Sequence, residues 1–227
     1  MTTTAARKGQ KGLAMEGAIA RWYDRNTRNY RVQFRKDAER ITATLAEGSK
    51  ILEVAPGPGF LSIEIAKRGR YDITGMDLSR TFVDLATANA REAGVNVTFR
   101  VGNASGMPFD DNGFDFVVCQ AAFKNFTEPE KAIDEMYRVL KPGCRALIND
   151  LRHDITDREI DDFVPMLGMS RVNAVLTRLT FKHMLRDRAF TIEQMRDLAA
   201  RSAFGSAEVV CVGLAMDVWL KKPSRTE

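Results

Sequence analysis

The chain has 227 residues, of which 44% are hydrophobic and 28% are charged, and its formal net charge is +4. This composition is ordinary for a globular protein that buries one core. No apolar run reaches about 18 residues and the N-terminus lacks an apolar signal stretch, so we expect neither a membrane span nor a secretory signal, and a cytoplasmic location.

The N-terminal part is polar and basic. Residues 1–12 predict a mobile arm, and helices are predicted over 13–27 and 31–46. Residues 1–40 hold ten Lys or Arg against four acids. A nucleic-acid-binding protein could use this basic stripe, but few aromatic residues are interleaved with it. We favour a solvated helix face that helps to guide an anionic ligand, and nucleic acid is not the expected partner.

Strands and helices then alternate. Strands are predicted over 51–54, 71–77, 97–101, 114–119 and 145–149, and helices over 61–67, 79–93 and from Thr127 to just before Lys141. Ser79 is the predicted cap of the second of these helices, and Thr127 to Glu130 reads as a capping box for the third. This alternation predicts a mainly parallel sheet with helices on both faces and a ligand site at the carboxyl ends of the strands.

Residues 151–189 break the alternation and predict a helical lid over that site. Its apolar residues could form a wall for a flat or greasy substrate, although core packing explains the same spacing and is favoured for each one; they are Met166, Leu167, Met169, Val175, Leu176, Leu179 and Met184. A capping box at Thr191 begins a last helix, and strands over 207–212 and 215–220 form a closing hairpin. The three cysteines lack C-x-x-C spacing and are predicted to be small buried residues, namely Cys119, Cys144 and Cys211.

A glycine turn follows the first strand. The stretch Glu53-x-Ala55-x-Gly57-x-Gly59 resembles motif I of class I S-adenosylmethionine-dependent methyltransferases, with Ala55 where the first glycine usually stands. A methyl group there is tolerated if the backbone angle φ is negative. A dinucleotide fingerprint fits less well, because Ser62 occupies the position of its third small apolar residue.

Two later segments strengthen the resemblance. Gly102-Asn103-Ala104 and Met107-Pro-Phe, followed by Phe114-Asp115, are similar to the pattern of small-molecule methyltransferases related to the ubiquinone and menaquinone enzymes. The resemblance implies S-adenosylmethionine as cofactor, with Asp77 accepting from the ribose hydroxyls and Asn103, in place of the usual Asp, accepting from the adenine amino group. The implied cofactor-binding residues are Glu53, Ala55, Gly57, Gly59, Asp77, Leu78, Asn103, Ala104 and Gln120.

The resemblance also implies a single α/β domain over residues 1–227, with a Rossmann-like, doubly wound, seven-stranded sheet. Its expected parts are the arm 1–12, N-terminal helices 13–47, a cofactor-binding core 48–150, the lid 151–189, and a last helix with the hairpin 190–227. The sequence is compatible with a homodimer, and no metal site is predicted.

The residues that would act on the acceptor are less clearly marked. Lys124 and Asn125 stand where many relatives carry two histidines. The candidates for a general base are His153, after the fifth strand, and Tyr23, which matches an N-terminal Tyr-Asp that closes over the cofactor in many relatives. Cys119 is not preceded by proline, so covalent catalysis is not proposed.

The resemblance implies methyl transfer to a small-molecule oxygen, nitrogen, sulfur or carbon by in-line displacement. An RNA or protein methyltransferase and a cofactor-binding protein without methyl transfer are the alternatives. An oxidoreductase is the least favoured class.

Overall fold

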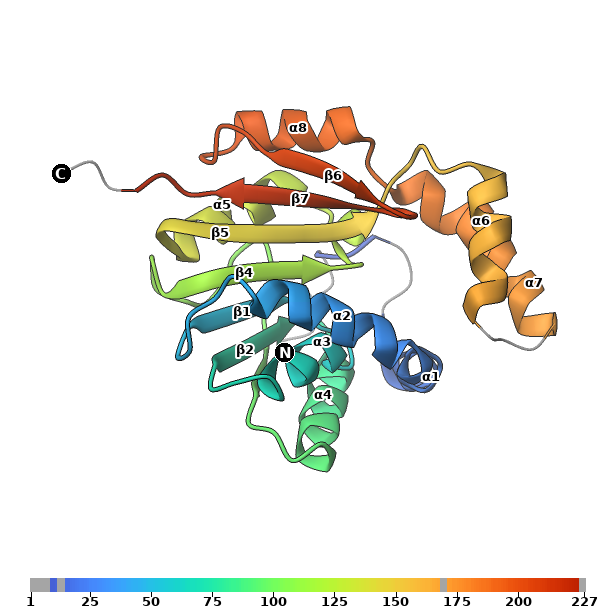
Figure 1. Ribbon diagram of the computed structural model, residues 1–227, viewed down its shortest axis with the longest axis horizontal. Helices are drawn as coiled ribbons and strands as arrows, with labels where there is room; N and C mark the ends of the chain where they lie inside the picture. The colour runs from blue at the N-terminus through green and yellow to red at the C-terminus, as the bar shows by residue number, and fades with distance from the viewer. Residues whose placement is uncertain (1–8, 12–14, 168–170, 225–227) are drawn as a thin grey trace, which may run out of the picture.

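The computed structural model describes residues 9–11, 15–167 and 171–224. Within these residues, seven strands form one sheet in the order β3-β2-β1-β4-β5-β7-β6 (Figure 1). The strands are β1 (Lys50–Val54), β2 (Asp72–Asp77), β3 (Thr98–Val101), β4 (Phe114–Gln120), β5 (Leu140–Leu151), β6 (Glu208–Val212) and β7 (Ala215–Lys221). Strand β7 is antiparallel to β5 and β6, and the other neighbouring pairs are parallel. The predicted doubly wound sheet with a terminal hairpin is confirmed.

Helices cover both faces of the sheet. The α-helices of the described residues, of which α1, α6 and α7 lie beyond the ends of the strands (Figure 1), are α1 (Gly17–Thr27), α2 (Arg31–Thr42), α3 (Phe60–Ala66), α4 (Arg80–Glu92), α5 (Pro129–Val139), α6 (Asp157–Phe163), α7 (Arg171–Thr180) and α8 (Ile192–Arg201). Helices α2 and α3 pack on one face through a cluster with Ile51 and Phe116, and α5 and α8 pack on the other through Leu52 and Val117. Successive residues of a strand point to opposite faces of the sheet. Because helices cover both faces, neighbouring residues such as Ile51 and Leu52 must both be apolar.

Short helical turns complete the chain. Four are 3₁₀ turns, at η2 (Arg28–Tyr30), η3 (Phe123–Asn125), η4 (Val164–Leu167) and η6 (Arg186–Arg188), and η5 (Phe181–Leu185) is a π turn. The turns η4, η5 and η6, together with α6 and α7, form the predicted helical segment between β5 and α8. This segment lies on the side of the molecule where the parallel strands end (Figure 1).

Side-chain caps explain several helix starts. Ser79 caps α4 by accepting from the backbone N–H of Phe82, and Thr191 forms the predicted capping box at α8. The box predicted at Thr127 is wrong, because Glu128 occupies the N-cap of α5 and makes no side-chain cap bond. A capping box that the sequence reading missed starts α6 at Thr156.

Three predicted boundaries are wrong. The helix predicted over 13–27 begins at Gly17, since Met15 and Glu16 are not helical. Helix α2 ends at Thr42, four residues early, because Thr44 and Leu45 donate to carbonyls three residues back and the chain tightens into 3₁₀-type turns. Strand β5 begins at Leu140, although the strand was predicted to begin at Arg145, and its register against β4 shifts between Phe114 and Phe116.

The predicted mobile arm is wrong for the residues that the structure describes. Gln10 bridges Phe126, the Lys11 N–H donates to the Asn125 carbonyl at 2.6 Å, and the Thr127 N–H donates to the Gly9 carbonyl at 3.3 Å. Residues 9–11 therefore pair with the segment after β4. The rest of the predicted arm lies outside the described residues.

Two expectations about burial are also wrong. The predicted core packing fails for five apolar residues of the lid segment, which are exposed: Met166, Val175, Leu176, Leu179 and Met184. Met169 and the side chain of Leu167 lie outside the described structure. Cys119 is buried as predicted, but Cys144 is half-buried and Cys211 is exposed. Across the described ranges, no helix is long and apolar enough to cross a membrane.

Candidate functional site

The turn after β1 contains a strained residue. The angle φ is 57° at Ala55, 53° at Gly57 and 80° at Gly59. The sequence expectation of a negative φ at Ala55 is therefore wrong. Alanine adopts this left-handed conformation at a cost of about 1–2 kcal/mol, so the turn keeps its shape although the glycine usual in the motif is missing.

The two glycines of the turn have different roles. A Cβ atom on Gly59 would lie 2.7 Å from Phe99 and 2.9 Å from Ala86, so this glycine lets α3 pack closely on its neighbours. Among the described residues, a Cβ atom on Gly57 would have one neighbour within 4 Å, the Tyr23 ring at 4.0 Å. Gly59 thus provides the close packing that the dinucleotide fingerprint assigns to its third glycine, whereas the described residues crowd Gly57 much less.

Two buried carboxylates hold the turn. Asp77, at the end of β2, accepts from the Gly57 N–H at 3.0 Å and from the Ser79 N–H at 2.8 Å. Glu53 accepts from the N–H of Ser62 at 3.0 Å and from its hydroxyl, which ties β1 to α3. Burial raises the pKa of Asp77, and it raises the pKa of Glu53 to about 7. Both residues shape the turn through these contacts.

Tyr23 lies over this turn from α1. Its ring packs edge-on against Phe82, with ring centroids 5.8 Å apart, and approaches Gly57. Loss of water around the hydroxyl raises the pKa of Tyr23 to about 12, and the charges of Asp150 and Asp77 add to this shift. At neutral pH Tyr23 therefore remains a hydrogen-bond donor, which argues against the predicted role as a general base.

A buried polar bridge holds α1 in this position. The Asn89 side-chain amide, on α4, donates to Asp24 Oδ1 at 2.9 Å and to the Pro58 carbonyl at 3.0 Å. Arg28 donates to the Asn89 Oδ1 at 2.7 Å. One asparagine thus links α1, α4 and the glycine turn, and sequence reasoning missed it. Its only signal was an asparagine inside a helix, where this residue is unfavourable without a specific partner.

Asn103 follows β3 and borders the N-terminal segment. Its Oδ1 accepts from the Ser105 N–H at 3.0 Å, which is the turn contact expected of an asparagine after a strand. A Cβ atom on Gly9 would lie 3.0 Å from the same Oδ1. The amide oxygen retains a second lone pair, so an adenine contact remains compatible with the turn. Leu78, which follows Asp77, and Ala104, which follows Asn103, are both half-buried. Their predicted cofactor contacts stay predictions.

Comparisons with known proteins extend these observations. Residues 52–148 match the family described as "Methyltransferase domain". The chain is 32% identical over 145 residues to a demethylmenaquinone methyltransferase of Deinococcus radiodurans, covering 62% of this chain and 60% of that protein. These matches identify residues 52–148 as a class I S-adenosylmethionine-dependent methyltransferase domain.

Two solved structures share the fold. A crystal structure of a putative S-adenosylmethionine-dependent methyltransferase from Methanococcus maripaludis has a TM-score of 0.76 at 19% identity, covering 96% of this chain and 98% of that one. The [4+2]-cyclase SpnF has a TM-score of 0.66 at 20% identity, covering 84% and 81%. At these identities the likeness shows the fold alone.

The methyltransferase site fits the family's cofactor, S-adenosylmethionine. The open face of Gly57 and the Asp77 carboxylate lie together at the carboxyl ends of β1 and β2, where this fold binds its ligands. Gln120, at the end of β4, has a buried Oε1 that finds no hydrogen-bond partner in the described structure. A ligand N–H group would satisfy that oxygen.

The Gln120 side chain belongs to a polar cluster under α2. Its Nε2 donates to Asp37 Oδ2 at 2.7 Å, and burial raises the pKa of Asp37. Asn149 donates to Asp217 at 2.6 Å, and Arg40 forms ion pairs with both Asp37 and Asp217. Gln120 therefore faces α2, and its predicted cofactor contact stays a prediction.

A buried ion pair joins the carboxyl ends of β4 and β5. Lys124 Nζ lies 2.7 Å from Asp150 Oδ1, and the Lys124 N–H donates to the other carboxylate oxygen at 2.8 Å. The same Nζ donates to the Ala121 carbonyl at 2.6 Å, and Ala121 has a φ of 57°. Lys124 thus ties the turn after β4 to the end of β5.

His153 is exposed in the turn after β5. Its backbone N–H donates to the Phe190 carbonyl at 3.0 Å, and its side chain reaches no residue of the glycine turn by any described contact. The structure does not bring the two predicted acid–base residues together, and the role of His153 stays a prediction.

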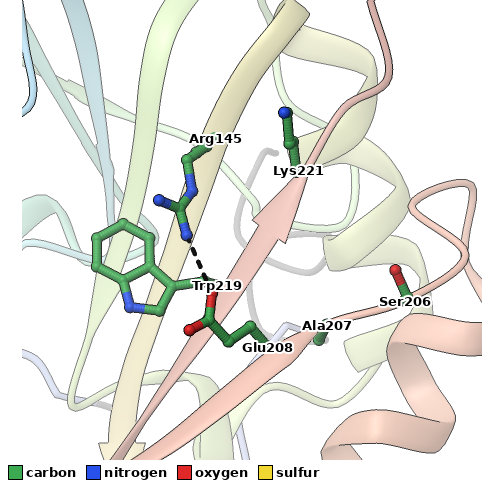
Figure 2. A pocket seen from close by; sticks show the side chains of 6 residues that line it. All are labelled: Arg145, Ser206, Ala207, Glu208, Trp219 and Lys221. Carbon is green, nitrogen blue, oxygen red and sulfur yellow. Dashed lines mark hydrogen bonds and ion pairs between the residues drawn. The ribbon is translucent and has the colours of Figure 1, made fainter.

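A surface hollow of about 290 Å³ lies away from these residues, between β5, β6 and β7. Figure 2 shows Arg145 stacked beside Trp219 and paired with Glu208. Arg145 is in register with Phe116, near the amino end of β4, so the hollow opens at the opposite edge of the sheet from Gly57. Among the described residues, no group of His, Cys, Asp and Glu is arranged to hold a metal ion.

Proposed function

We propose that the protein transfers a methyl group from S-adenosylmethionine to a small-molecule acceptor. The observation that carries this proposal is the Asp77 carboxylate, held by two backbone N–H groups beside the open face of Gly57. The named function of the Deinococcus relative, which acts on demethylmenaquinone, supports a small aromatic acceptor. The matched stretch spans 60% of that protein, so the acceptor is part of the proposal.

The chain's own residues would mainly bind and orient. When bound, S-adenosylmethionine would supply an electrophilic sulfonium methyl group, and transfer of that methyl group to the acceptor would leave S-adenosylhomocysteine. Asp77 would accept from the ribose hydroxyls, and Tyr23 would cover the turn and exclude water. The attacking atom loses its proton to water or to His153 if it arrives protonated.

Binding of S-adenosylhomocysteine tests the site. Calorimetry should give a saturable complex, and Asp77→Ala should weaken it about 10- to 100-fold, because charge-assisted hydrogen bonds are lost. Asp72→Ala is the matched control, since Asp72 is exposed at the other end of the same strand. A folded wild-type protein that does not bind would overturn the proposal.

A second candidate is a cofactor-binding protein that transfers no methyl group. Two observations favour keeping this candidate. The chain shares its fold with a protein named as a [4+2]-cyclase. In addition, Lys124 is locked in an ion pair with Asp150 at a position where the resemblance implies a histidine. It predicts binding of S-adenosylhomocysteine without methylated product from reduced quinones, phenols, amines or thiols, measured by mass spectrometry. Methylation of any of them rejects it.

Action on RNA is supported less well. Two of the basic side chains are held in internal ion pairs, Arg28 with Asp24 and Arg40 with Asp217. RNA retention that falls with salt would favour this alternative.

A further inference from the structure

Exposed apolar side chains are concentrated in two parts of the molecule. Within the described residues, eleven large hydrophobic side chains are exposed, and nine of them lie in the lid segment or in the first two helices. The other two are Val210 and Val212, on the edge strand β6. Soluble proteins rarely gather exposed apolar groups in this way without a partner.

Helix α7 carries a continuous apolar stripe. Val172, Val175, Leu176 and Leu179 follow the spacing of one helix face, and each is at least 49% exposed. No residue of α7 is buried. The other side of the helix is anchored to α6, where Arg178 pairs with Asp161 at 2.7 Å. The stripe therefore points away from the helix to which α7 is fastened.

Helix α1 presents a second apolar group beside basic residues. Ile19 and Trp22 are exposed, and Trp22 has 57% of its surface accessible. Arg21 and Arg25 flank Trp22 and are also exposed. Figure 1 shows α1 and α7 on the same side of the molecule, beyond the carboxyl ends of the parallel strands.

Basic side chains accompany the exposed apolar groups of both helices. The acid within α1 is Asp24, which is buried and bound to Asn89, and the stretch 171–186 contains no acid. Three bases of the α7 segment are balanced by acids of α6, because Arg178 pairs with Asp161 and both Lys182 and Arg186 pair with Asp157. The exposed bases that give this side its positive charge are Arg21 and Arg25 on α1 and Arg171 on α7. Helices that combine exposed apolar groups with basic residues, and lack acids, are typical of surfaces that bind anionic lipid.

We infer that α1 and α7 form a docking face for an anionic lipid surface. Trp22, Leu176 and Leu179 enter the interface, and Arg21 and Arg25 bind the headgroups. Exposure and charge carry this inference, which is independent of the proposed methyl transfer. The docked protein would place the carboxyl ends of β1 and β2 toward the lipid, so an acceptor dissolved there would have a short path to the site.

Co-sedimentation with vesicles tests this face. Wild-type protein should bind vesicles made of equal parts phosphatidylcholine and phosphatidylglycerol at least about tenfold better than pure phosphatidylcholine vesicles, and added salt should weaken the binding. Trp22→Ser with Leu176→Ser should reduce it about tenfold or more, from lost apolar burial. Val210→Ser with Val212→Ser removes two exposed apolar side chains elsewhere and is the matched control.

Fluorescence gives a second readout. The chain has two tryptophans, so a Trp219→Phe variant leaves Trp22 as the reporter, whose emission should shift to the blue on anionic vesicles. Absence of binding to anionic vesicles, or an equal loss in the control variant, would overturn the inference. A dimer by sedimentation velocity that the Trp22→Ser and Leu176→Ser changes dissociate would assign the face to a second copy and would also overturn it.

Discussion

Replacing Ala121 by glycine should stabilise the protein. Ala121 follows β4 with a φ of 57° and is exposed, so its methyl group contributes little packing. Relief of the left-handed conformation is worth about 1–2 kcal/mol, and the added freedom of glycine in the unfolded chain costs about 0.4–1 kcal/mol. The net gain in the free energy of unfolding is about 0.5–1 kcal/mol, or about 2 °C in Tm for a chain of this size.

Urea and thermal unfolding would measure this gain, with Ala88→Gly as the control. Ala88 is exposed in the middle of α4, where glycine should lower the free energy of unfolding by about 1 kcal/mol. Opposite signs for the two variants are the expected result. If Ala121→Gly lowered the free energy of unfolding as much as Ala88→Gly does, the argument from backbone strain would be refuted. Ala55→Gly should give a smaller gain than Ala121→Gly, since the Ala55 methyl group packs against the core.

Two further predictions concern the support of the glycine turn. Asn89→Ala removes the hydrogen bonds to Asp24 and Pro58 and should weaken S-adenosylhomocysteine binding about tenfold in calorimetry. The control is Asn96→Ala, at an exposed site. An unchanged affinity in Asn89→Ala would contradict the idea that this asparagine supports the glycine turn. Glu53 has its pKa raised from 4.5 to about 7, so the stability that its protonated form provides is complete below pH 4.5 and lost as pH rises through 7. The free energy of unfolding of wild type relative to Glu53→Gln should therefore fall by about 3 kcal/mol between these pH values, and a flat difference across the urea titrations would reject the shift.

The sheet and the site's position were predictable because their signals are local. Apolar runs of strand length, the glycine turn after Val54 and the cap at Ser79 each depend on neighbouring residues in the sequence, and the structure has all three. The backbone angle at Ala55 was not predictable, because alanine seldom adopts a left-handed conformation and only the surrounding fold imposes it.

Long-range pairing explains most of what the sequence did not indicate. Residues 9–11 are polar, and their pairing with the segment around Phe126 leaves no periodic signal. The bridge at Asn89 depends on contacts with residues more than thirty positions away in the sequence. The apolar spacing of α7 was visible, but a hydrophobic face does not specify what covers it, and the expected packing proved wrong for Leu176 and Leu179.

The contact between Gly9 and Asn103 bears on how the protein should be handled for binding experiments. An affinity tag attached directly before Gly9 would start next to Asn103, the predicted adenine contact. Such a tag could compete with the cofactor for that position. At the other end, Lys221 closes β7 in register with Arg145, at the far edge of the sheet (Figure 1). A tag attached beyond β7 would follow the end of the sheet that lies away from Asp77 and Gly57, so the geometry favours that attachment for the calorimetry.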